Sequence, residues 1–244
     1  SLNAMLAALD ASRRQQQRLV SDADHELRTP LTSMRTNIEI LARQPDMPAD
    51  ERRQVVAALT GQVEELAHLV DDLVELARHP DSRTEDIEEV PFDEVVIAAV
   101  ERARPRAPDV DIDIVDLEPT LVRGRRRQLE RAVVNLLDNA CKWSPPGSRV
   151  EIRVAGGRVT IRDHGVGIDD ADLPYVFDRF YRAPSARSAP GSGLGLSIVR
   201  RIVDEHGGSV VLRPAGDGGT IATLALPVVD AAPRAVGGRP HAPS

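Results

Sequence analysis

The sequence of 244 residues contains a single cysteine, Cys141, and no apolar run long enough to cross a membrane. One cysteine excludes an intrachain disulfide and fits a reducing compartment. A membrane-spanning helix needs about 18 consecutive apolar residues. The N-terminus has no basic segment followed by an apolar run, so no signal peptide is expected. The net charge of −7 argues against a nucleic-acid partner, because such surfaces usually carry a basic excess.

Lysine is almost absent, since nearly all of the positive charge is arginine and Lys142 stands alone. In such a chain the one lysine suggests a position that needs a flexible ammonium group. The remaining composition is ordinary: 41% of the residues are hydrophobic and 28% are charged. These proportions are typical of a soluble globular protein, and the length allows one large or two modest domains.

Apolar residues in the first third recur at close to the 3.5-residue spacing of a coiled-coil seam. The first run contains Met5, Leu9, Leu19, Ala23, Met34, Ile38 and Leu41, and the second contains Val56, Leu59, Val63, Leu66, Val70 and Leu73. Residues 44–50 include two prolines and predict a turn, with a second helix opening at Pro48. The pattern predicts an all-α helical hairpin, two copies of which would pair as a dimeric four-helix bundle. A simple dimerisation coil is the alternative.

The spacing of the apolar residues changes after a linker that is polar, acidic and bounded by prolines. Helices are predicted at 92–103, 125–143 and 194–206, and strands at 110–115, 149–154, 158–163, 209–213 and 220–226. Mixed elements of this kind predict an α+β two-layer sandwich with its helices on one face of the sheet. The last residues are rich in Ala, Pro and Gly and are predicted to be disordered.

The segment Asp24-His25-Glu26-Leu27-Arg28-Thr29-Pro30-Leu31 holds the first candidate site. If Ala23 lies on the seam, His25 is about 200° around the helix and faces solvent. Pro30 crowds the carbonyl of Glu26, so the helix is expected to bend or loosen beyond the histidine. An exposed imidazole beside a carboxylate suits nucleophilic work, because Glu26 can accept one ring proton and leave the other nitrogen free to attack. A solvated surface histidine is the alternative.

The predicted helix 125–143 holds a second candidate site. Asn135 and Asn139 are four residues apart and share a face, with Lys142 one turn further along. Two neutral oxygen donors suit Mg²⁺ when phosphate and water complete its coordination, and the ammonium group can neutralise phosphate charge. An asparagine pair on a helix can also be only a polar stripe.

Two glycine segments accompany this helix. Asp163-His164-Gly165-Val166-Gly167 directly follows a predicted strand, where a carboxylate can accept a bond from an adenine amino group. The second segment is Gly191-Ser192-Gly193-Leu194-Gly195, which opens a predicted helix. The unpaired backbone N–H groups and the dipole at a helix N-terminus favour binding of an anion. The second segment fits neither a dinucleotide-binding turn nor a P-loop.

Together these motifs resemble the sensor histidine kinases of two-component systems. His25 to Leu31 is similar to the H-box of their HisKA-type dimerisation domain. The asparagine helix and the two glycine segments resemble the N-box and glycine boxes of the GHKL (Bergerat) type ATP-binding domain, which type II topoisomerases, heat-shock chaperones and mismatch-repair proteins share. Residues 177–182 look like the family's F-box.

The resemblance implies a role for each matching residue. His25 is the phosphoacceptor, Glu26 its acid/base partner, and Thr29 positions water when the phosphorylated regulator is hydrolysed. Asn135 and Asn139 hold Mg²⁺ and phosphates. The other implied contacts to ATP come from Lys142, Asp163, Gly165, Gly167, Arg179, Gly193, Leu194 and Gly195. The implied function is MgATP-dependent autophosphorylation, followed by transfer to an aspartate of a response regulator receiver domain, with regulator phosphatase activity.

The resemblance also implies an organisation of the chain. The implied segments are the end of a HAMP-like helix (1–10), a dimerisation and phosphotransfer domain (11–78), a linker (79–91), a catalytic domain (92–228, with a lid at about 178–192) and a disordered tail (229–244). Because a HAMP helix normally follows a membrane span, the chain is expected to be the cytoplasmic portion of an inner-membrane sensor. It is also expected to be a homodimer.

Three departures and three alternatives accompany the resemblance. The family often has Asp where Arg125 stands, and we interpret the cluster 123–127 as a solvated or phosphate-facing patch. His164 replaces a common Asn, and Trp143 replaces a common Tyr or Phe and either stacks near the base or belongs to the core. The alternatives are an ATP-driven clamp, which would lack the H-box, a non-enzymatic scaffold, and a kinase that works mainly as a phosphatase.

Overall fold

The computed structural model describes residues 2–77, 86–186 and 191–229. The side chains of residues 2–20, 22, 25, 65, 75 and 77 are not described. The chain divides into two compact units, Ser1–Arg83 with Pro174–Ile198, and Thr84–Leu173 with Val199–Ser244. Part of the expected linker, part of the expected lid and nearly all of the expected tail lie outside the described residues.

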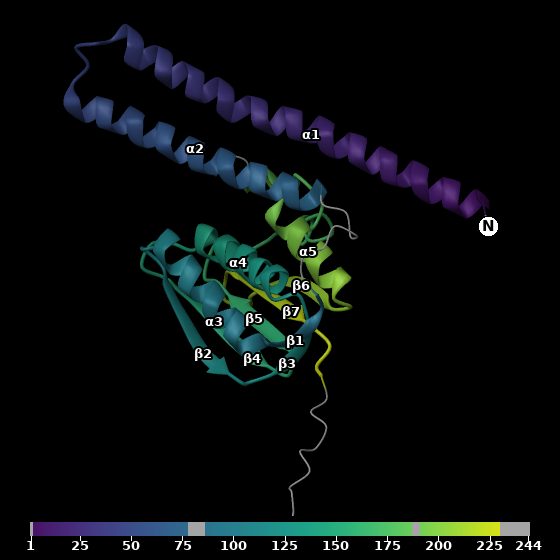
Figure 1. Cartoon of the computed structure of the whole chain (residues 1–244). Coiled ribbons are helices and arrows are strands. Elements are labelled where there is room, and N and C mark those ends of the chain that lie inside the picture. The colour runs from purple at the N-terminus through teal and green to yellow at the C-terminus, as the bar shows by residue number, and fades with distance from the viewer. Residues whose placement is uncertain (1, 78–85, 187–190, 230–244) are drawn as a thin grey trace, which may run out of the picture. The chain divides into compact units, whose positions relative to one another are not determined.

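The first unit contains the helical hairpin that the heptad pattern predicts. Helix α1 spans Leu2–Arg43 and helix α2 spans Ala49–Ala77, and the two pack side by side (Figure 1). Helix α2 starts directly after Pro48, and its first turn carries Asp50 and Glu51, whose charge is favourable at a helix N-terminus. Helix α1 is continuous from its N-terminal end and across Pro30, so the proline does not terminate it.

A polar cluster crosses the interface between the two helices of the hairpin. The amide nitrogen of Gln62 donates to Ser33 Oγ at 2.6 Å, and Asn37 donates to Gln62 Oε1 at 3.4 Å. Leu69 and Leu76 are buried on α2, and Met47 is buried in the turn. Since partly buried polar groups must find partners, this cluster favours one register of α1 against α2.

The second unit contains a five-stranded sheet in the order β2-β4-β5-β7-β6. Strand β2 (Asp111–Leu117) pairs with β4 in parallel, and every other neighbouring pair is antiparallel. The other strands are β4 (Arg149–Ala155), β5 (Arg158–Arg162), β6 (Ser209–Pro214) and β7 (Thr220–Ala225). The four strands predicted at 149–154, 158–163, 209–213 and 220–226 therefore pair as two hairpins, β4–β5 and β6–β7.

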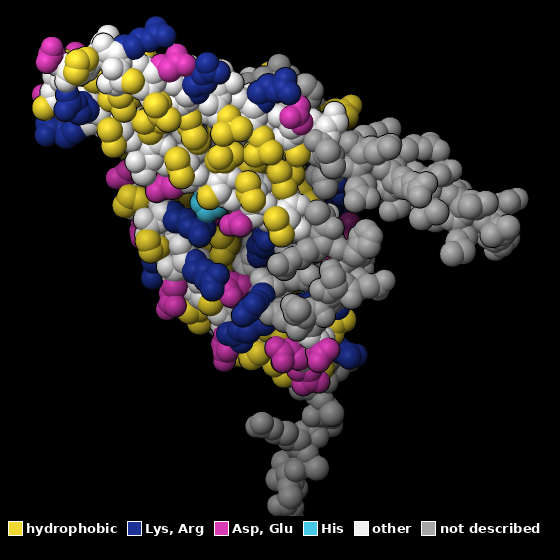
Figure 2. Space-filling model, turned by 45° about the horizontal axis from the view of Figure 1, so that its top comes forward, with side chains coloured by type: hydrophobic (Ala, Val, Ile, Leu, Met, Phe, Trp, Pro, Cys, Tyr) yellow, Lys and Arg dark blue, Asp and Glu magenta, His cyan; other side chains and the backbone are white. Residues whose placement is uncertain are grey.

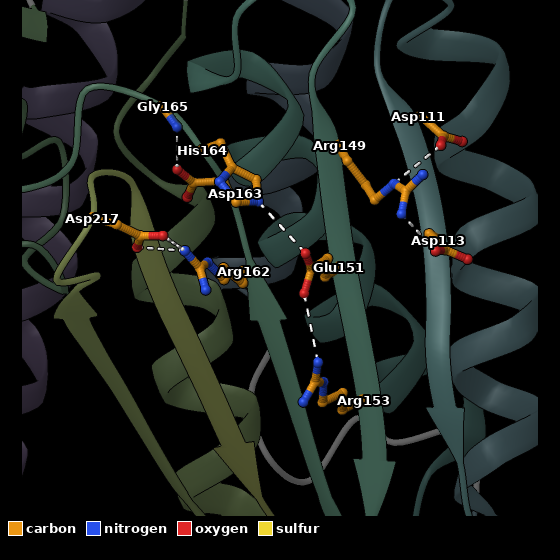
Figure 3. A network of polar contacts seen from close by, with 10 residues as sticks. All are labelled: Asp111, Asp113, Arg149, Glu151, Arg153, Arg162, Asp163, His164, Gly165 and Asp217. Atoms are coloured by element: carbon orange, nitrogen blue, oxygen red, sulfur yellow. Dashed lines mark hydrogen bonds and ion pairs between the residues drawn. The ribbon is translucent and has the colours of Figure 1, made fainter.

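One face of the sheet is apolar and the other is charged, as a two-residue period requires. Val150, Ile152 and Val154 of β4 are buried. The residues that alternate with them form ion pairs on the opposite face, where Arg149 lies between Asp111 and Asp113 at 3.4 and 3.5 Å (Figure 3). Exposed pairs of this kind contribute only about 0–1 kcal/mol each, so the apolar face accounts for the stability of the sheet.

Helices cover the apolar face. Helix α3 spans Phe92–Ala103, and helix α4 spans Arg126–Trp143 and packs against both α3 and β5 (Figure 1). Helix α5 spans Gly195–Glu205. Their inward residues include Phe92, Leu129, Leu136, Leu137 and Ile202, all of which are buried. The predicted helices are confirmed to within two residues at each end.

The sequence patterns miss a second, two-stranded sheet. Strand β1 (Glu88–Pro91), at the end of the expected linker, pairs antiparallel with β3 (Leu121–Gly124). Val90 lies opposite Val122, and both are buried. Four-residue strands are too short to show a period, so only their long-range pairing reveals them. The linker prediction is therefore wrong for residues 88–91.

No helix within the described residues is long and apolar enough to span a bilayer.

The pairing of β1 generates a stability prediction. Val90→Ala should lower the free energy of unfolding of the sheet-containing unit by about 2 kcal/mol, because it empties space around a side chain that is 1% exposed. Urea unfolding followed by the fluorescence of Trp143, the only tryptophan, measures the change. The matched control Val211→Ala removes the same two methyl groups from a side chain that is 48% exposed and should cost less than about 1 kcal/mol. Equal losses would contradict the burial of β1.

Candidate active site

The candidate phosphoacceptor segment lies within α1. His25 and Glu26 occupy consecutive positions of the helix, with Thr29 one turn further along and exposed. Arg28 forms an ion pair with Asp24 at 2.9 Å. The His25 side chain lies outside the described residues, so its exposure stays a prediction.

Helix α4 places the candidate metal ligands next to the core. The helix buries one side, including Val133, Leu136 and Ala140. Asn135 and Asn139 flank that side and are half-buried, and Lys142 is exposed. The amide nitrogen of Asn135 is buried and has no hydrogen-bond partner in the described part of the chain. A buried amide without a partner is costly, and such a group is typical of a site that a ligand completes.

Trp143 organises the end of α4. Its indole N–H donates to Asn139 Oδ1 at 3.3 Å, which fixes the orientation of that amide because the indole can only donate. The Lys142 ammonium lies 4.7 Å from the centre of the same ring, within the range of a cation–π contact. Neither contact is evident from the sequence, although the i, i+4 spacing of Asn139 and Trp143 makes the first one possible.

Asp163 is the most deeply buried carboxylate of the candidate site. It directly follows β5, is 4% exposed, and its Oδ1 accepts the backbone N–H of Gly165 at 2.9 Å and of Thr220 at 3.0 Å. Figure 3 shows the Gly165 amide directed at this carboxylate. Burial raises the pKa of Asp163, while the two backbone amides and nearby His164 oppose the shift. The carboxylate is thus oriented by the backbone in a poorly hydrated position.

Gly165 is needed for close packing within the protein. A Cβ at this position would lie 2.3 Å from the carbonyl oxygen of Trp143, so no other residue fits without a backbone shift. This contact joins the loop after β5 to the C-terminus of α4. The sequence-based reason for this glycine, approach to a purine, is therefore not its only reason.

Cys141 lies on the same helix and is buried. Burial, with smaller contributions from Asp138 and Asp163, raises the pKa of its thiol to about 11. The thiol is therefore protonated at neutral pH and is a poor nucleophile. Cys141 has a packing role.

The second glycine segment and the F-box belong to the unit that contains the hairpin. The Gly193 carbonyl accepts the backbone N–H of Phe180 at 3.1 Å. Phe180 has a φ of 60°, a strained conformation for a residue with a bulky side chain, and strain of this kind clusters at functional segments. Leu194 is buried, and α5 begins at Gly195. Arg179 is half-buried, and the Tyr175 and Tyr181 rings lie 5.6 Å apart.

The arginine cluster 123–127 is not a single patch. Arg125 is 6% exposed, so the interpretation of a solvated position is wrong for this residue, and the phosphate-facing alternative stays a prediction. Arg126 pairs with Glu94 of α3 at 3.1 Å, which ties the start of α4 to its neighbouring helix. Arg125 immediately precedes α4, and the strand-to-helix turn at this point carries its side chain into the protein.

Two family models match the chain. The "His Kinase A (phospho-acceptor) domain" matches residues 15–81, and the "Histidine kinase-, DNA gyrase B-, and HSP90-like ATPase" matches residues 124–230. A solved structure titled "Mycobacterial sensor histidine kinase MprB" is 42% identical, with a TM-score of 0.54, and covers 58% of this chain and 98% of its own. The chain belongs to the sensor histidine kinase family. Its helical hairpin and following sandwich are the fold expected for that family.

Two further relatives of this histidine kinase extend the match. The signal transduction histidine-protein kinase/phosphatase MprB of Mycolicibacterium vanbaalenii is 44% identical over 239 residues, or 94% of this chain and 49% of the relative. The cytoplasmic segment of histidine kinase QseC is 26% identical, with a TM-score of 0.50, over 68% of this chain and 95% of that one. The chain spans about half the length of the curated relatives that it matches.

The geometry of the histidine kinase brings part of the candidate site together. Contacts within the sheet-containing unit connect Asn139 to Trp143, Trp143 to Gly165, and Gly165 to Asp163. Gly167 lies in the same loop, with a positive φ of 79°. The H-box and the segment with Arg179 and Gly193 belong to the other unit, and their relation to this cluster stays a prediction.

The buried carboxylate generates a pH-dependent prediction. A raised pKa means that the folded state holds the Asp163 proton more tightly, so this group's contribution to stability is present below its ordinary pKa of 3.8 and is lost as pH rises through the folded value. Asp163→Asn removes the titrating group, so the variant does not lose this stability as pH rises. Its side-chain oxygen can still accept the backbone N–H groups of Gly165 and Thr220. The variant should be at least as stable as wild type at pH 7, with an advantage that shrinks toward pH 4. Urea unfolding at both pH values measures it, and an advantage that grows in acid would contradict the assigned burial.

Proposed function

We propose that this chain is the cytoplasmic catalytic portion of a membrane-anchored sensor kinase that phosphorylates its own His25 from MgATP. It then transfers the phosphoryl group to an aspartate of a response regulator receiver domain. The observation that carries the proposal is the presence in one chain of the H-box on α1 and of the linked cluster of Asn139, Trp143, Gly165 and Asp163. The match to a structure of the cytoplasmic segment of QseC supports the proposed location.

Adenine recognition follows from the fixed carboxylate of Asp163. Two backbone amides orient it, and the poorly hydrated surroundings strengthen any further hydrogen bond that it accepts. An adenine amino group is a donor and suits this acceptor, whereas the carbonyl at the same place in guanine would be repelled. The loop of Gly165 and Gly167 would line the base.

The donor set on α4 fits a magnesium ion and its phosphates. Asn135 and Asn139 offer amide oxygens, which Mg²⁺ accepts as ligands. The buried amide nitrogen of Asn135, which has no partner among the described residues, could donate to a phosphate oxygen. When bound, Mg²⁺ would neutralise part of the triphosphate charge. Lys142 and Arg179 would add positive charge, and Gly193, Leu194 and Gly195 would offer backbone amides to the phosphates.

The chemical step is an in-line displacement. One ring nitrogen of His25 attacks the γ-phosphorus, the bond from phosphorus to the β–γ bridging oxygen breaks, and ADP leaves with that electron pair. Glu26 accepts the proton of the other ring nitrogen, so the phosphorylated imidazole is neutral on its ring. Positioning and charge neutralisation supply most of the catalysis, as is usual in phosphoryl transfer.

The unpartnered face of the hairpin supports a homodimer. One set of apolar side chains stays exposed in the single chain, and Figure 2 shows hydrophobic side chains gathered along this hairpin. The set comprises Leu31, Ile38, Val56, Val63, Val70 and Val74. Val56, Val63 and Val70 repeat every seven residues, the spacing of a seam that a second hairpin would cover.

The regulator is the proposed partner both in phosphotransfer from His25 and in the hydrolysis of its own phosphoryl group. Thr29 lies one turn beyond His25 on the same helix and would position the water that hydrolyses the phosphorylated regulator. The name of the MprB relative includes phosphatase, which supports this second activity. A kinase that works mainly as a phosphatase would show rapid regulator dephosphorylation and little autophosphorylation.

The autophosphorylation proposal predicts where label from ATP appears. Incubation with γ-labelled ATP should give acid-labile, base-stable phosphate on the wild-type chain, and His25→Gln should abolish it. Nucleotide titration of this variant should match wild type, because the substitution leaves every proposed ATP contact in place. Label that persists in His25→Gln would refute the assignment of His25. A wild-type chain that binds ATP but is not labelled would favour an ATP-driven clamp. A wild-type chain that binds no ATP would favour a scaffold.

The dimer proposal predicts the effect of a charge on the seam. Val63→Glu should weaken dimerisation at least about 100-fold, because each interface would bury two unpaired carboxylates. Val63 is 56% exposed in the single chain, so the variant should still fold. The control Gly61→Glu adds the same charge two residues earlier, where a new Cβ meets nothing within 4 Å. Sedimentation equilibrium should show a dimer for the control, and a dimeric Val63→Glu would place the interface elsewhere.

A further inference from the structure

His206 joins the end of one helix to the beginning of another. Its Nε2 accepts the backbone N–H of Arg125 at 3.0 Å, and its Nδ1 lies 2.7 Å from the carbonyl oxygen of Ile202. A backbone N–H can only donate and a carbonyl can only accept, so the ring must carry its proton on Nδ1. The ring is thus a neutral imidazole with both nitrogens engaged. The family resemblance assigns no role to this residue.

The end of α5 holds the ring in place. The N–H of Gly208 donates to the carbonyl of Val203 at 2.9 Å, and the N–H of Gly207 donates to that of Asp204 at 3.1 Å. With Gly207 at a φ of 67°, these bonds form a Schellman motif in which His206 is the C-cap. The backbone that carries the ring is therefore rigid.

The ring supports the turn from β3 into α4. Arg125 stands at the N-cap of α4, where backbone amides have no partner inside the helix. Because Arg125 is 6% exposed, water does not readily replace His206 as the acceptor of its amide. The ring also touches the backbone at Gly124, where a Cβ would lie 2.7 Å from His206 Cδ2. His206 therefore serves as both acceptor and spacer at this junction.

We propose that His206 is a positioning residue for the nucleotide site, an inference that rests on the proposed function. It fixes the start of α4, the helix that carries Asn135 and Asn139, to the end of α5, the helix that begins at Gly195. Helices are stiff, and Asn135 lies about 15 Å along the axis from Arg125, so a small tilt at the junction displaces the metal-binding amides. His206 acts through the two helices and does not touch the reacting atoms.

A matched pair of variants separates the hydrogen bond from simple packing. Gln and Met have similar length and volume, but only Gln can present an acceptor to the Arg125 amide. His206→Gln should bind MgATP nearly as wild type does, and His206→Met should bind it about five- to tenfold more weakly, the usual effect of losing one buried hydrogen bond. Isothermal titration with MgATP, well below the unfolding temperature, measures both. In autophosphorylation the loss should appear in KM for ATP more than in kcat.

Hydrogen exchange of the Arg125 amide provides a second readout. Coupling between two sites is reciprocal. If the hydrogen bond from the Arg125 amide to His206 is coupled to nucleotide binding, saturating MgATP should slow exchange at Arg125 by a factor close to the loss of affinity in His206→Met. The amide of Ile152, in the interior strand β4, reports global stabilisation and serves as the reference. A merely structural role would not produce this additional protection.

Three outcomes would overturn the inference. The first is that His206→Met binds MgATP like wild type, the second is that His206→Gln binds it as weakly as His206→Met does, and the third is that MgATP protects Arg125 and Ile152 equally. A wild-type chain that binds no MgATP would instead refute the proposed function, and with it this role.

Discussion

The packing of α4 against the sheet is the interaction on which the candidate site depends. The apolar side of the helix, with Leu129, Val133 and Leu136, is buried and fixes the rotation of the helix about its axis. This rotation places the side chains of Asn135 and Asn139 at the margin of the core. Because Gly165 touches the end of the same helix, the helix also positions the loop that carries Asp163. The burial of apolar side chains thus determines where the polar side chains of the candidate site lie.

The candidate site is built at some cost to stability. Burial raises the pKa of Asp163, the amide of Asn135 has no partner among the described residues, and Phe180 has a positive φ. Each feature is unfavourable in isolation, and features of this kind cluster at functional sites. The hairpin carries a similar cost at its surface, since Val56, Val63 and Val70 are exposed in a single chain and would be covered only in the proposed dimer.

Much of the fold could be predicted from local pattern. The heptads predicted α1 and α2, and the two-residue alternation within 110–115 predicted β2, because these elements are long enough to show their period. Strands β1 and β3 could not be predicted in the same way, since they are four residues long and depend on each other. Arg125 was misjudged for a similar reason: five residues rich in arginine look solvated until the turn into α4 buries one of them.

The sequence by itself determined the family and the order of elements, and it proposed the residues for the chemistry, because these are properties of residue type and spacing. The tertiary structure alone decided that the indole of Trp143 orients Asn139, that the amide of Thr220 helps to hold Asp163, and that His206 supports the start of α4. Thr220 is 57 residues from Asp163, and His206 is 81 residues from Arg125. Contacts over such separations depend on how the helices pack on the sheet, and no local pattern encodes them.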